Sequence, residues 1–96
     1  MGVYLIIDIK IRDKEKFNEY LGKAKPIVES FGGHYLVREG KITPLSDVWE
    51  PERIVIIEFK NKQSLKECFA SERYLKIKHL REESIDFNSV MVEENE

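Results

Sequence analysis

Hydrophobic side chains occupy both faces of the first segment that is predicted to be a β-strand, residues 3–11. One face of this strand carries only aliphatic residues, namely Val3, Leu5, Ile7, Ile9 and Ile11. The other face begins with Tyr4 and Ile6, although this face is normally polar when helices cover only one side of an antiparallel sheet. Residues 54–57 are four consecutive aliphatic residues and show the same pattern. Both strands are therefore predicted to be shielded from water on both faces.

The segment after the first strand has the pattern of an amphipathic helix. Asp13 stands where an N-cap residue belongs, and apolar residues follow at helical spacing as far as Phe31. Pro26 interrupts the pattern and is expected to kink this helix rather than to end it. Gly32 and Gly33 are expected to terminate the helix, because glycine tolerates the left-handed backbone geometry of a helix end.

The remaining chain is predicted to contain three more strands and a second helical region. The strands are expected at residues 34–38, 53–59 and 85–92. Pro44 and Pro51 exclude a central strand between the first two of these, so the connection is expected to be irregular. Asn61 can cap the second helical region, which is expected to be interrupted near Ser71 and then to continue to Leu80.

The order of these elements, strand, helix, strand, strand, helix, strand, predicts a fold of the α+β class. It is the order of the ferredoxin-like βαββαβ arrangement, an antiparallel four-stranded sheet with two helices on one face. Residues 1–96 are expected to form a single domain. The first and third strands are neighbours in the centre of such a sheet, and they are the two strands with apolar residues on both faces.

A second copy of the chain is predicted to cover the side of the sheet that the helices leave open. If Tyr4, Ile6, Ile54 and Ile56 stayed exposed to water, the protein would lose the favourable free energy of burial, about 1.5–3 kcal/mol for each side chain. Two facing sheets double this set, for a gross gain on the order of 15 kcal/mol, whereas association costs about 4–15 kcal/mol. We therefore expect an isologous homodimer that is joined sheet to sheet.

The composition is that of a globular protein that neither binds nucleic acid nor spans a membrane. The 16 Lys and Arg and the 18 Asp and Glu are interspersed and give a net charge of -2, so no basic surface is expected for a phosphate backbone. The longest apolar runs are far shorter than the roughly 20 residues of a membrane helix. A single cysteine, Cys68, and the absence of a signal-peptide pattern favour a reducing, cytoplasmic location.

Four ordered motifs in the chain are similar to those of a known family. They are Gly32-Gly33-His34-Tyr35-Leu36-Val37-Arg38, Trp49-Glu50-Pro51-Glu52-Arg53, Ile57-Glu58-Phe59 and Ser71-Glu72-Arg73-Tyr74. In this order they resemble the signatures of the domain-of-unknown-function 1330 family, which belongs to the dimeric α/β-barrel superfamily. The resemblance extends from Tyr4 to Val92. It implies a ferredoxin-like protomer and a sheet-to-sheet dimer, but no particular reaction.

The chain departs from the pattern of this family at three positions. His34 stands where the family often has an arginine or another polar residue, so a role of that arginine cannot be carried over. Lys60 and Glu72 stand where proline is common, which affects only the entry into helical segments. Related families on this fold include cofactor-free monooxygenases, muconolactone isomerases, haem-dependent chlorite dismutases and ligand-sensing domains of transcription regulators. The resemblance to this fold therefore does not decide the function.

Two carboxylates, Asp8 and Glu58, are candidates for proton transfer. Alternation places both on the same face of the sheet as Ile6, where partial burial can raise the pKa of a carboxylate. If Ile6 lies opposite Ile56, then Tyr4 neighbours Glu58, and Asp8 lies well apart from Glu58. The structural alternative is that each carboxylate pairs with Lys or Arg across the dimer.

A histidine at the start of the second strand, His34, is the third candidate for proton transfer, because its imidazole titrates near neutral pH. An ordinary histidine at a strand end is the alternative. The chain has only two histidines, and His79 is expected on a solvated helix face. Since no spacing of metal ligands and no phosphate-binding or nucleophile motif is present, we expect neither a metal nor a cofactor.

Three arginines can grip a planar oxyanion in bidentate fashion: Arg38, Arg53 and Arg81. Arg38 and Arg53 fall within or beside predicted strands, so these two are the candidates for anion binding. Trp49 and Tyr74 are the candidates for the apolar part of a cleft between helices and sheet. The alternatives are salt bridges from the arginines to neighbouring glutamates, and a Trp49 that only anchors the long connection to the core.

These candidates support three hypotheses on function. The first is a homodimer whose protomers each bind a small anionic or aromatic metabolite between the helices and the sheet. The second is a cofactor-independent monooxygenase or isomerase in which His34 or Glu58 moves the proton. The third is a module that serves assembly alone. The sequence leaves open whether the protein is an enzyme, since an enzyme requires a titratable group that faces an enclosed cavity.

Overall fold

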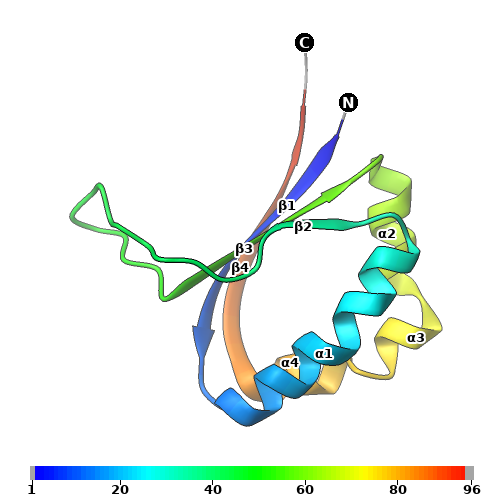
Figure 1. The fold of residues 1–96 in the computed structure, drawn as a ribbon, viewed down its shortest axis with the longest axis horizontal. Helices are drawn as coiled ribbons and strands as arrows, with labels where there is room; N and C mark the ends of the chain where they lie inside the picture. Colours follow the sequence, from blue (N-terminus) through cyan, green and yellow to red (C-terminus); the bar gives the residue numbers. More distant parts are fainter. Residues whose placement is uncertain (1, 95–96) are drawn as a thin grey trace.

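The structure is a computed structural model that describes residues 2–94. Its elements are β1 (Val3–Ile11), α1 (Lys14–Ser30), β2 (His34–Val37), β3 (Arg53–Phe59), α2 (Lys62–Ala70), α3 (Glu72–Leu75), α4 (Lys78–Ser84) and β4 (Ile85–Glu93). The four strands form one antiparallel sheet in the order β2-β3-β1-β4. All four helices pack on one face of this sheet (Figure 1). The predicted ferredoxin-like α+β fold is therefore confirmed.

The two central strands pair in the register that was assumed above for the placement of Asp8 and Glu58. Ile6 lies opposite Ile56, and Tyr4 lies opposite Glu58. Asp8 lies opposite Ile54, four residues along β3 from Glu58, so the two carboxylates are well apart. This register keeps the aliphatic residues of both strands on matching faces, because a shift by one residue would move each side chain to the other face.

The predicted cap residues begin the helices. The side chains of Asp13, Asn61 and Ser71 each accept a hydrogen bond from the backbone N–H three residues further on, at 3.1, 2.8 and 3.2 Å. Helix α1 continues through Pro26 to its last residue, and Gly32 beyond its end has a positive φ of 81°. These side-chain bonds satisfy backbone donors that have no partner within the helix.

The second helical region is divided twice, whereas one interruption was predicted. After the break at Ser71, helix α3 makes only one turn, and α4 begins after Ile77 without a side-chain cap. The second break turns the chain so that three apolar side chains of this region are buried, with 1, 9 and 6% exposure for Tyr74, Ile77 and Leu80. Burial of these side chains accounts for a break that the local sequence does not signal.

No helix within residues 2–94 is long and apolar enough to cross a membrane.

The core lies between the sheet and the helices, and one glycine limits how closely they pack. An added Cβ at Gly33 would lie 2.5 Å from Cγ1 of Val28 and 2.9 Å from Cε1 of Phe59. Both neighbours are buried, so they have little room to move. Gly22 on α1, in contrast, has no atom within 4 Å of such a Cβ.

We expect Gly33→Ala to lower the free energy of unfolding by about 2–3 kcal/mol, because overpacked cores are strained. Urea denaturation measures this change. Gly22→Ala is the matched control and should raise the free energy of unfolding by about 0.5–1 kcal/mol, since alanine favours the helix. Equal effects of the two substitutions would contradict the packing described for Gly33.

The face of the sheet that is turned away from the helices is called the open face here. Its central row runs across all four strands through Val37, Ile56, Ile6 and Val90. Val90 is 58% exposed, and Ile6 and Ile56 are half-buried. No helix within residues 2–94 covers this face (Figure 1). The predicted apolar face is therefore present, and a single chain leaves it open.

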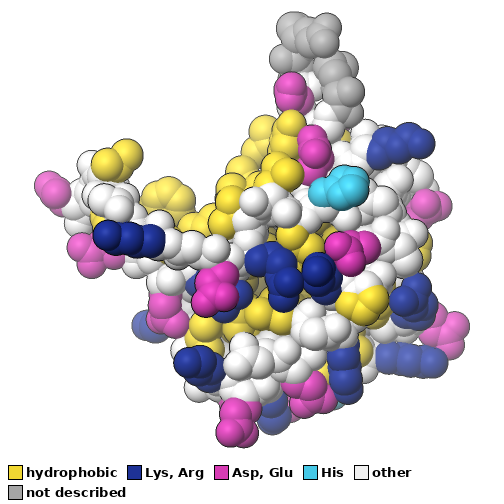
Figure 2. Space-filling view, viewed as in Figure 1, with side chains coloured by type: hydrophobic (Ala, Val, Ile, Leu, Met, Phe, Trp, Pro, Cys, Tyr) yellow, Lys and Arg dark blue, Asp and Glu magenta, His cyan; other side chains and the backbone are white. Residues whose placement is uncertain are grey.

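Residues 38–52, called the arm, connect β2 to β3 as an irregular loop and project from the sheet (Figure 1). Two hydrogen bonds join the arm to β1. Nε1 of Trp49 donates to Oδ2 of Asp8 at 2.8 Å, and the backbone N–H of Ile11 donates to Oε1 of Glu52 at 3.1 Å. The arm bears exposed hydrophobic side chains, and a hollow lined by hydrophobic residues separates it from the far end of the sheet (Figure 2).

Candidate functional site

A cavity of about 200 Å³ lies between the helices and the sheet. Its walls on the sheet come from β1 and β4 and include Leu5, Ile7, Ile85 and Phe87. Its walls on the helices come from all four helices, with Tyr20 on α1, Leu65 and Phe69 on α2, Tyr74 on α3 and Arg81 on α4. The lining is therefore mostly apolar and aromatic, with a few polar groups that converge from separate elements, as is typical of small-molecule sites.

The polar groups of this cavity form a short hydrogen-bonded chain. Nη1 of Arg81 donates to the hydroxyl oxygen of Tyr74 at 2.9 Å, and the hydroxyl groups of Tyr74 and Tyr20 lie 2.7 Å apart. Burial, and then the neighbouring Tyr74, raise the pKa of Tyr20 far above its usual value, so this phenol remains protonated. One phenol proton is shared within the Tyr20–Tyr74 pair, and the other is left for a further acceptor.

The guanidinium of Arg81 has no carboxylate partner within 4.0 Å among residues 2–94. Its Nε atom is buried without a hydrogen-bond partner. The group lies over the ring of Phe87 at 4.7 Å and over the ring of Tyr74 at 5.8 Å. Arg81 is half-buried, and a cation withdrawn from water in this way is usually paired with an anion, because an unpaired charge in an apolar site is costly. The cavity therefore presents an uncompensated positive charge.

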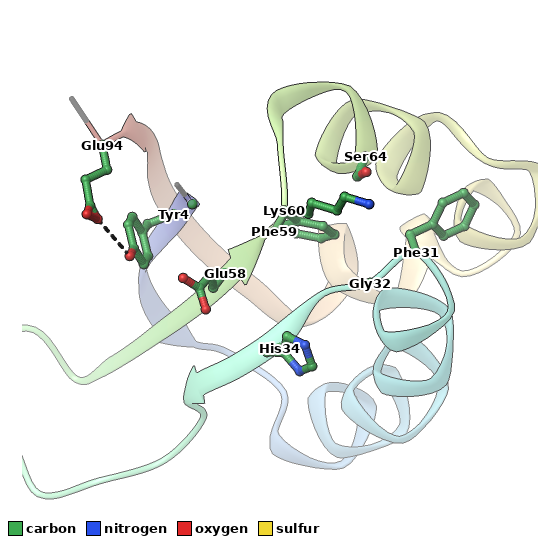
Figure 3. Close-up of a pocket in the computed structure, with 10 residues that line it drawn as sticks. Tyr4, Phe31, Gly32, His34, Glu58, Phe59, Lys60, Ser64 and Glu94 are labelled. Atoms are coloured by element: carbon green, nitrogen blue, oxygen red, sulfur yellow. Dashed lines mark hydrogen bonds between the residues drawn. The ribbon is translucent and has the colours of Figure 1, made fainter. Parts of the chain in front are cut away.

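A second hollow, a groove of about 760 Å³, lies at the end of the open face where β1 begins (Figure 3). His34, Glu58 and Tyr4 stand in one row across β2, β3 and β1 and line this groove. The hydroxyl of Tyr4 donates to Oε2 of Glu94 at 3.2 Å. Glu94 first, and Glu58 second, raise the pKa of Tyr4. The structure thus brings two of the proton-transfer candidates, His34 and Glu58, to one place.

The remaining proton-transfer candidate, Asp8, lies elsewhere on the open face. It lines a different hollow together with Trp49, to which it is hydrogen-bonded. A joint role with Glu58 would require movement of the strands, because the two residues are four positions apart in the register. Asp8 therefore acts in this structure as the acceptor that holds the base of the arm.

Among the four ligand-binding candidates, only Tyr74 lines the cavity between the helices and the sheet. Trp49 lies on the arm. Arg53 shares the helix-side face with its partner Ile9, and its Nε donates to the carbonyl oxygen of Arg38 at 2.9 Å. The cation that reaches the cavity is instead Arg81. Helix α4 leads directly into β4, which is at the opposite edge of the sheet from β2, and the cavity lies over β1 and β4.

Both strand-associated arginines rest on aromatic rings. The guanidinium of Arg53 lies 5.0 Å from the ring centre of Phe17, and that of Arg38 lies 5.4 Å from the ring centre of Tyr35. The salt bridges to glutamate considered as an alternative are absent among residues 2–94. Anion binding by these two arginines stays a prediction.

Within the described part of the chain, no group of three His, Cys, Asp or Glu is placed to hold a metal ion. Burial raises the pKa of the Cys68 thiol to about 11, and the side chain is fully buried. The thiol therefore stays protonated and out of contact with solvent, which makes it a core residue.

The sequence did not single out Tyr20, Phe69 or Phe87 for the cavity, because each fits the apolar pattern of its own element. In the sequence, Arg81 is one of three fixed positive charges but is not a candidate for anion binding, because it lies outside the predicted strands. No local spacing relates Arg81 to Tyr74, because the two residues lie on separate short helices, α4 and α3.

Solved structures with little sequence identity share this fold. The RPA0582 protein of unknown function from Rhodopseudomonas palustris has a TM-score of 0.83 at 12% identity, over 99% of this chain and 83% of that chain. SnoaB, a cofactor-independent oxygenase from Streptomyces nogalater, has a TM-score of 0.70 at 7% identity, over 99% and 94% of the two chains. A putative antibiotic biosynthesis monooxygenase from Nitrosomonas europaea has a TM-score of 0.60 at 15% identity, over 98% of each chain.

Identities this low establish a common fold and leave the activity open. The sequence matches no curated protein. The model of one family matches nearly the whole chain, residues 2–95, in agreement with the four motifs quoted above. The chain belongs to the family described as a domain of unknown function, DUF1330.

Proposed function

We propose that this protein binds a small, planar, anionic metabolite in the cavity between the helices and the sheet. The observation that supports this most directly is the guanidinium of Arg81, which has no carboxylate partner within residues 2–94 and whose buried Nε has no hydrogen-bond partner, in a mostly apolar lining. A ligand with an oxyanion supplies the negative charge that residues 2–94 do not place beside Arg81. The ligand thereby converts a costly isolated charge into a charge-assisted hydrogen bond.

The hydrogen-bonding groups of the cavity define the polar end of the ligand. Nε and Nη2 of Arg81 have no hydrogen-bond partner within residues 2–94, and the Tyr20–Tyr74 pair has one phenol proton to spare. These groups donate hydrogen bonds. A carboxylate accepts several donors at once and matches the planar guanidinium in bidentate fashion.

The shape and lining of the cavity define the apolar end of the ligand. A volume of about 200 Å³ is below the range of about 300–1,000 Å³ that is usual for drug-sized ligands. Phe69 and Tyr74 already pack edge to face at 4.8 Å in this lining, and Phe87 faces the guanidinium. One aromatic ring with a carboxylate substituent suits this space, because ring edges and faces attract one another at such distances.

A panel of three compounds tests this function by isothermal titration calorimetry. Benzoate should bind, whereas benzamide, which has nearly the same shape without the charge, should bind at least about tenfold more weakly. Cyclohexanecarboxylate keeps the charge without the flat ring and should lie between the two. Equal affinity for benzoate and benzamide, or no heat from any compound, would refute the proposal.

The functional unit in this proposal is a homodimer joined through the open face. The apolar row through Ile6 and Ile56 supports it, because the helices of the same chain lie on the other side of the sheet. A second copy brings an identical apolar face, which suits an isologous interface. Each protomer keeps its own cavity, since the cavity lies on the helix side.

A cofactor-independent monooxygenase or isomerase is the second candidate function. It is supported by the row of His34, Glu58 and Tyr4 in the groove, and by the fold shared with an oxygenase. The binding function is favoured because no imidazole or carboxylate of residues 2–94 lines the cavity on the helix side. Incubation of the protein with each of the three compounds under air separates the two candidate functions. A monooxygenase consumes oxygen and an isomerase converts the compound, whereas a binding protein does neither.

A further inference from the structure

Two aliphatic side chains at the tip of the arm are almost completely exposed. Leu45 is 99% exposed and Val48 is 95% exposed, which is more than any other large hydrophobic side chain of residues 2–94. Trp49 next to them is 53% exposed. Single exposed hydrophobic residues are common on protein surfaces, whereas several on one projecting segment mark an interaction surface.

The base of this arm is fixed beside the open face. Trp49 donates to Asp8, an open-face residue of β1, at 2.8 Å. Glu52 accepts a hydrogen bond from the backbone of Ile11 at the end of the same strand. Pro51 restricts the backbone between these two points, and Pro44 restricts it nearer the tip of the arm. The arm extends away from the helices (Figure 1), so its exposed side chains lie on the side of the molecule where the open face is uncovered.

The apolar surface of the arm is continuous with the open face. A hollow of about 250 Å³ is lined by residues of the arm, among them Ile42, Leu45 and Trp49, and by Ile54 of β3. Ile54 is two residues before Ile56, so both side chains are on the open face. Figure 2 shows hydrophobic side chains along the hollow between the arm and the sheet. One partner can therefore cover both surfaces at once.

We propose that the arm of each protomer packs, through Leu45 and Val48, on the open face of a second copy of this chain. The proposal rests on the homodimer proposed above, because a copy seated on the open face lies within reach of the arm beside that face. Since an isologous interface repeats every contact, each sheet receives the arm of its partner. The arms then cover hydrophobic surface that both chains leave exposed when they are separate.

Cross-linking from the arm tests this contact directly. Leu45→Cys introduces a thiol on the surface, and the native Cys68 does not compete because it is fully buried. A photoreactive maleimide on this thiol is activated in mixtures of unlabelled and ¹⁵N-labelled chains. Cross-links between chains of different isotopic label, to peptides that contain Ile6, Ile56 or Val90, are expected. Cross-links confined to one chain, in a sample that sediments as a dimer, would overturn the proposal.

Charge substitutions in the arm provide an independent measurement. Leu45→Asp combined with Val48→Asp should raise the dimer dissociation constant by at least about 100-fold in sedimentation equilibrium. Lys41→Asp changes a polar, exposed residue of the same arm and should have a much smaller effect. An unchanged constant for the double variant would refute the arm contact and leave the homodimer intact, whereas a monomeric wild-type protein would refute both.

Discussion

Replacement of Arg81 by methionine is expected to weaken benzoate binding by roughly 10- to 100-fold, the equivalent of a hydrogen bond to a charged group. Methionine keeps much of the side-chain volume and removes the charge and every donor. Calorimetric titration of the variant measures the loss. The free energy of unfolding without ligand should change little or rise, because the substitution also removes a half-buried cation that lacks an anionic partner.

Arg73→Met is the matched control for this experiment. Arg73 lies on α3, is exposed, and donates to the hydroxyl of Ser30 at 3.0 Å. It is not part of the cavity lining. The control removes the same charge from the exposed surface of the preceding helix and should leave benzoate binding unchanged. Equal losses for the two variants would mean that net charge attracts benzoate and that Arg81 has no special place in the site.

Ile6→Asp is expected to convert the dimer into monomers, with a rise of roughly a thousandfold or more in the dissociation constant. Ile6 lies in the central row of the open face, opposite Ile56 and Val90. Each dimer would lose two buried side chains and would have to bury two carboxylates in an apolar interface. Light scattering at micromolar concentration measures the change in mass.

Asn18→Asp is the control for the dimer experiment, since it adds the same charge on an exposed position of α1. It should leave the dissociation constant unchanged. Benzoate affinity of a monomeric Ile6→Asp variant is informative as well, because the cavity lies on the other side of the sheet. A dimeric Ile6→Asp variant would show that the open face is not the interface.

Much of the architecture could be predicted from the positions of hydrophobic residues. The register of β1 and β3 followed from one matching pair, Ile6 and Ile56, because alternation of side chains then places every other residue of both strands. The helix starts followed from the oxygen-bearing side chains of Asp13, Asn61 and Ser71, whose local hydrogen bonds need no tertiary contact.

The second break in the helical region could not be predicted in this way. Ile77 carries no capping side chain, and its residue type is compatible with a continuous helix. The break appears only when the helix packs against the sheet and buries Tyr74 and Leu80. This break also sets the direction in which α4 presents Arg81. The position of Arg81 in the cavity therefore could not be predicted either.

The candidate site residues also differ in how far their positions could be predicted from the sequence. The sequence alone indicated that Glu58 shares the open face with Tyr4, because alternation and register set the pairing within one sheet. That His34 lies opposite Glu58 on the same face came from the structure. The sequence also determined that the centre of that face is apolar. Only the tertiary structure decided that Arg81, and not Arg53, joins Tyr74 in the cavity. The physical reason is that this site is made of side chains from separate helices, whose meeting depends on how those helices pack on the sheet and not on any local spacing.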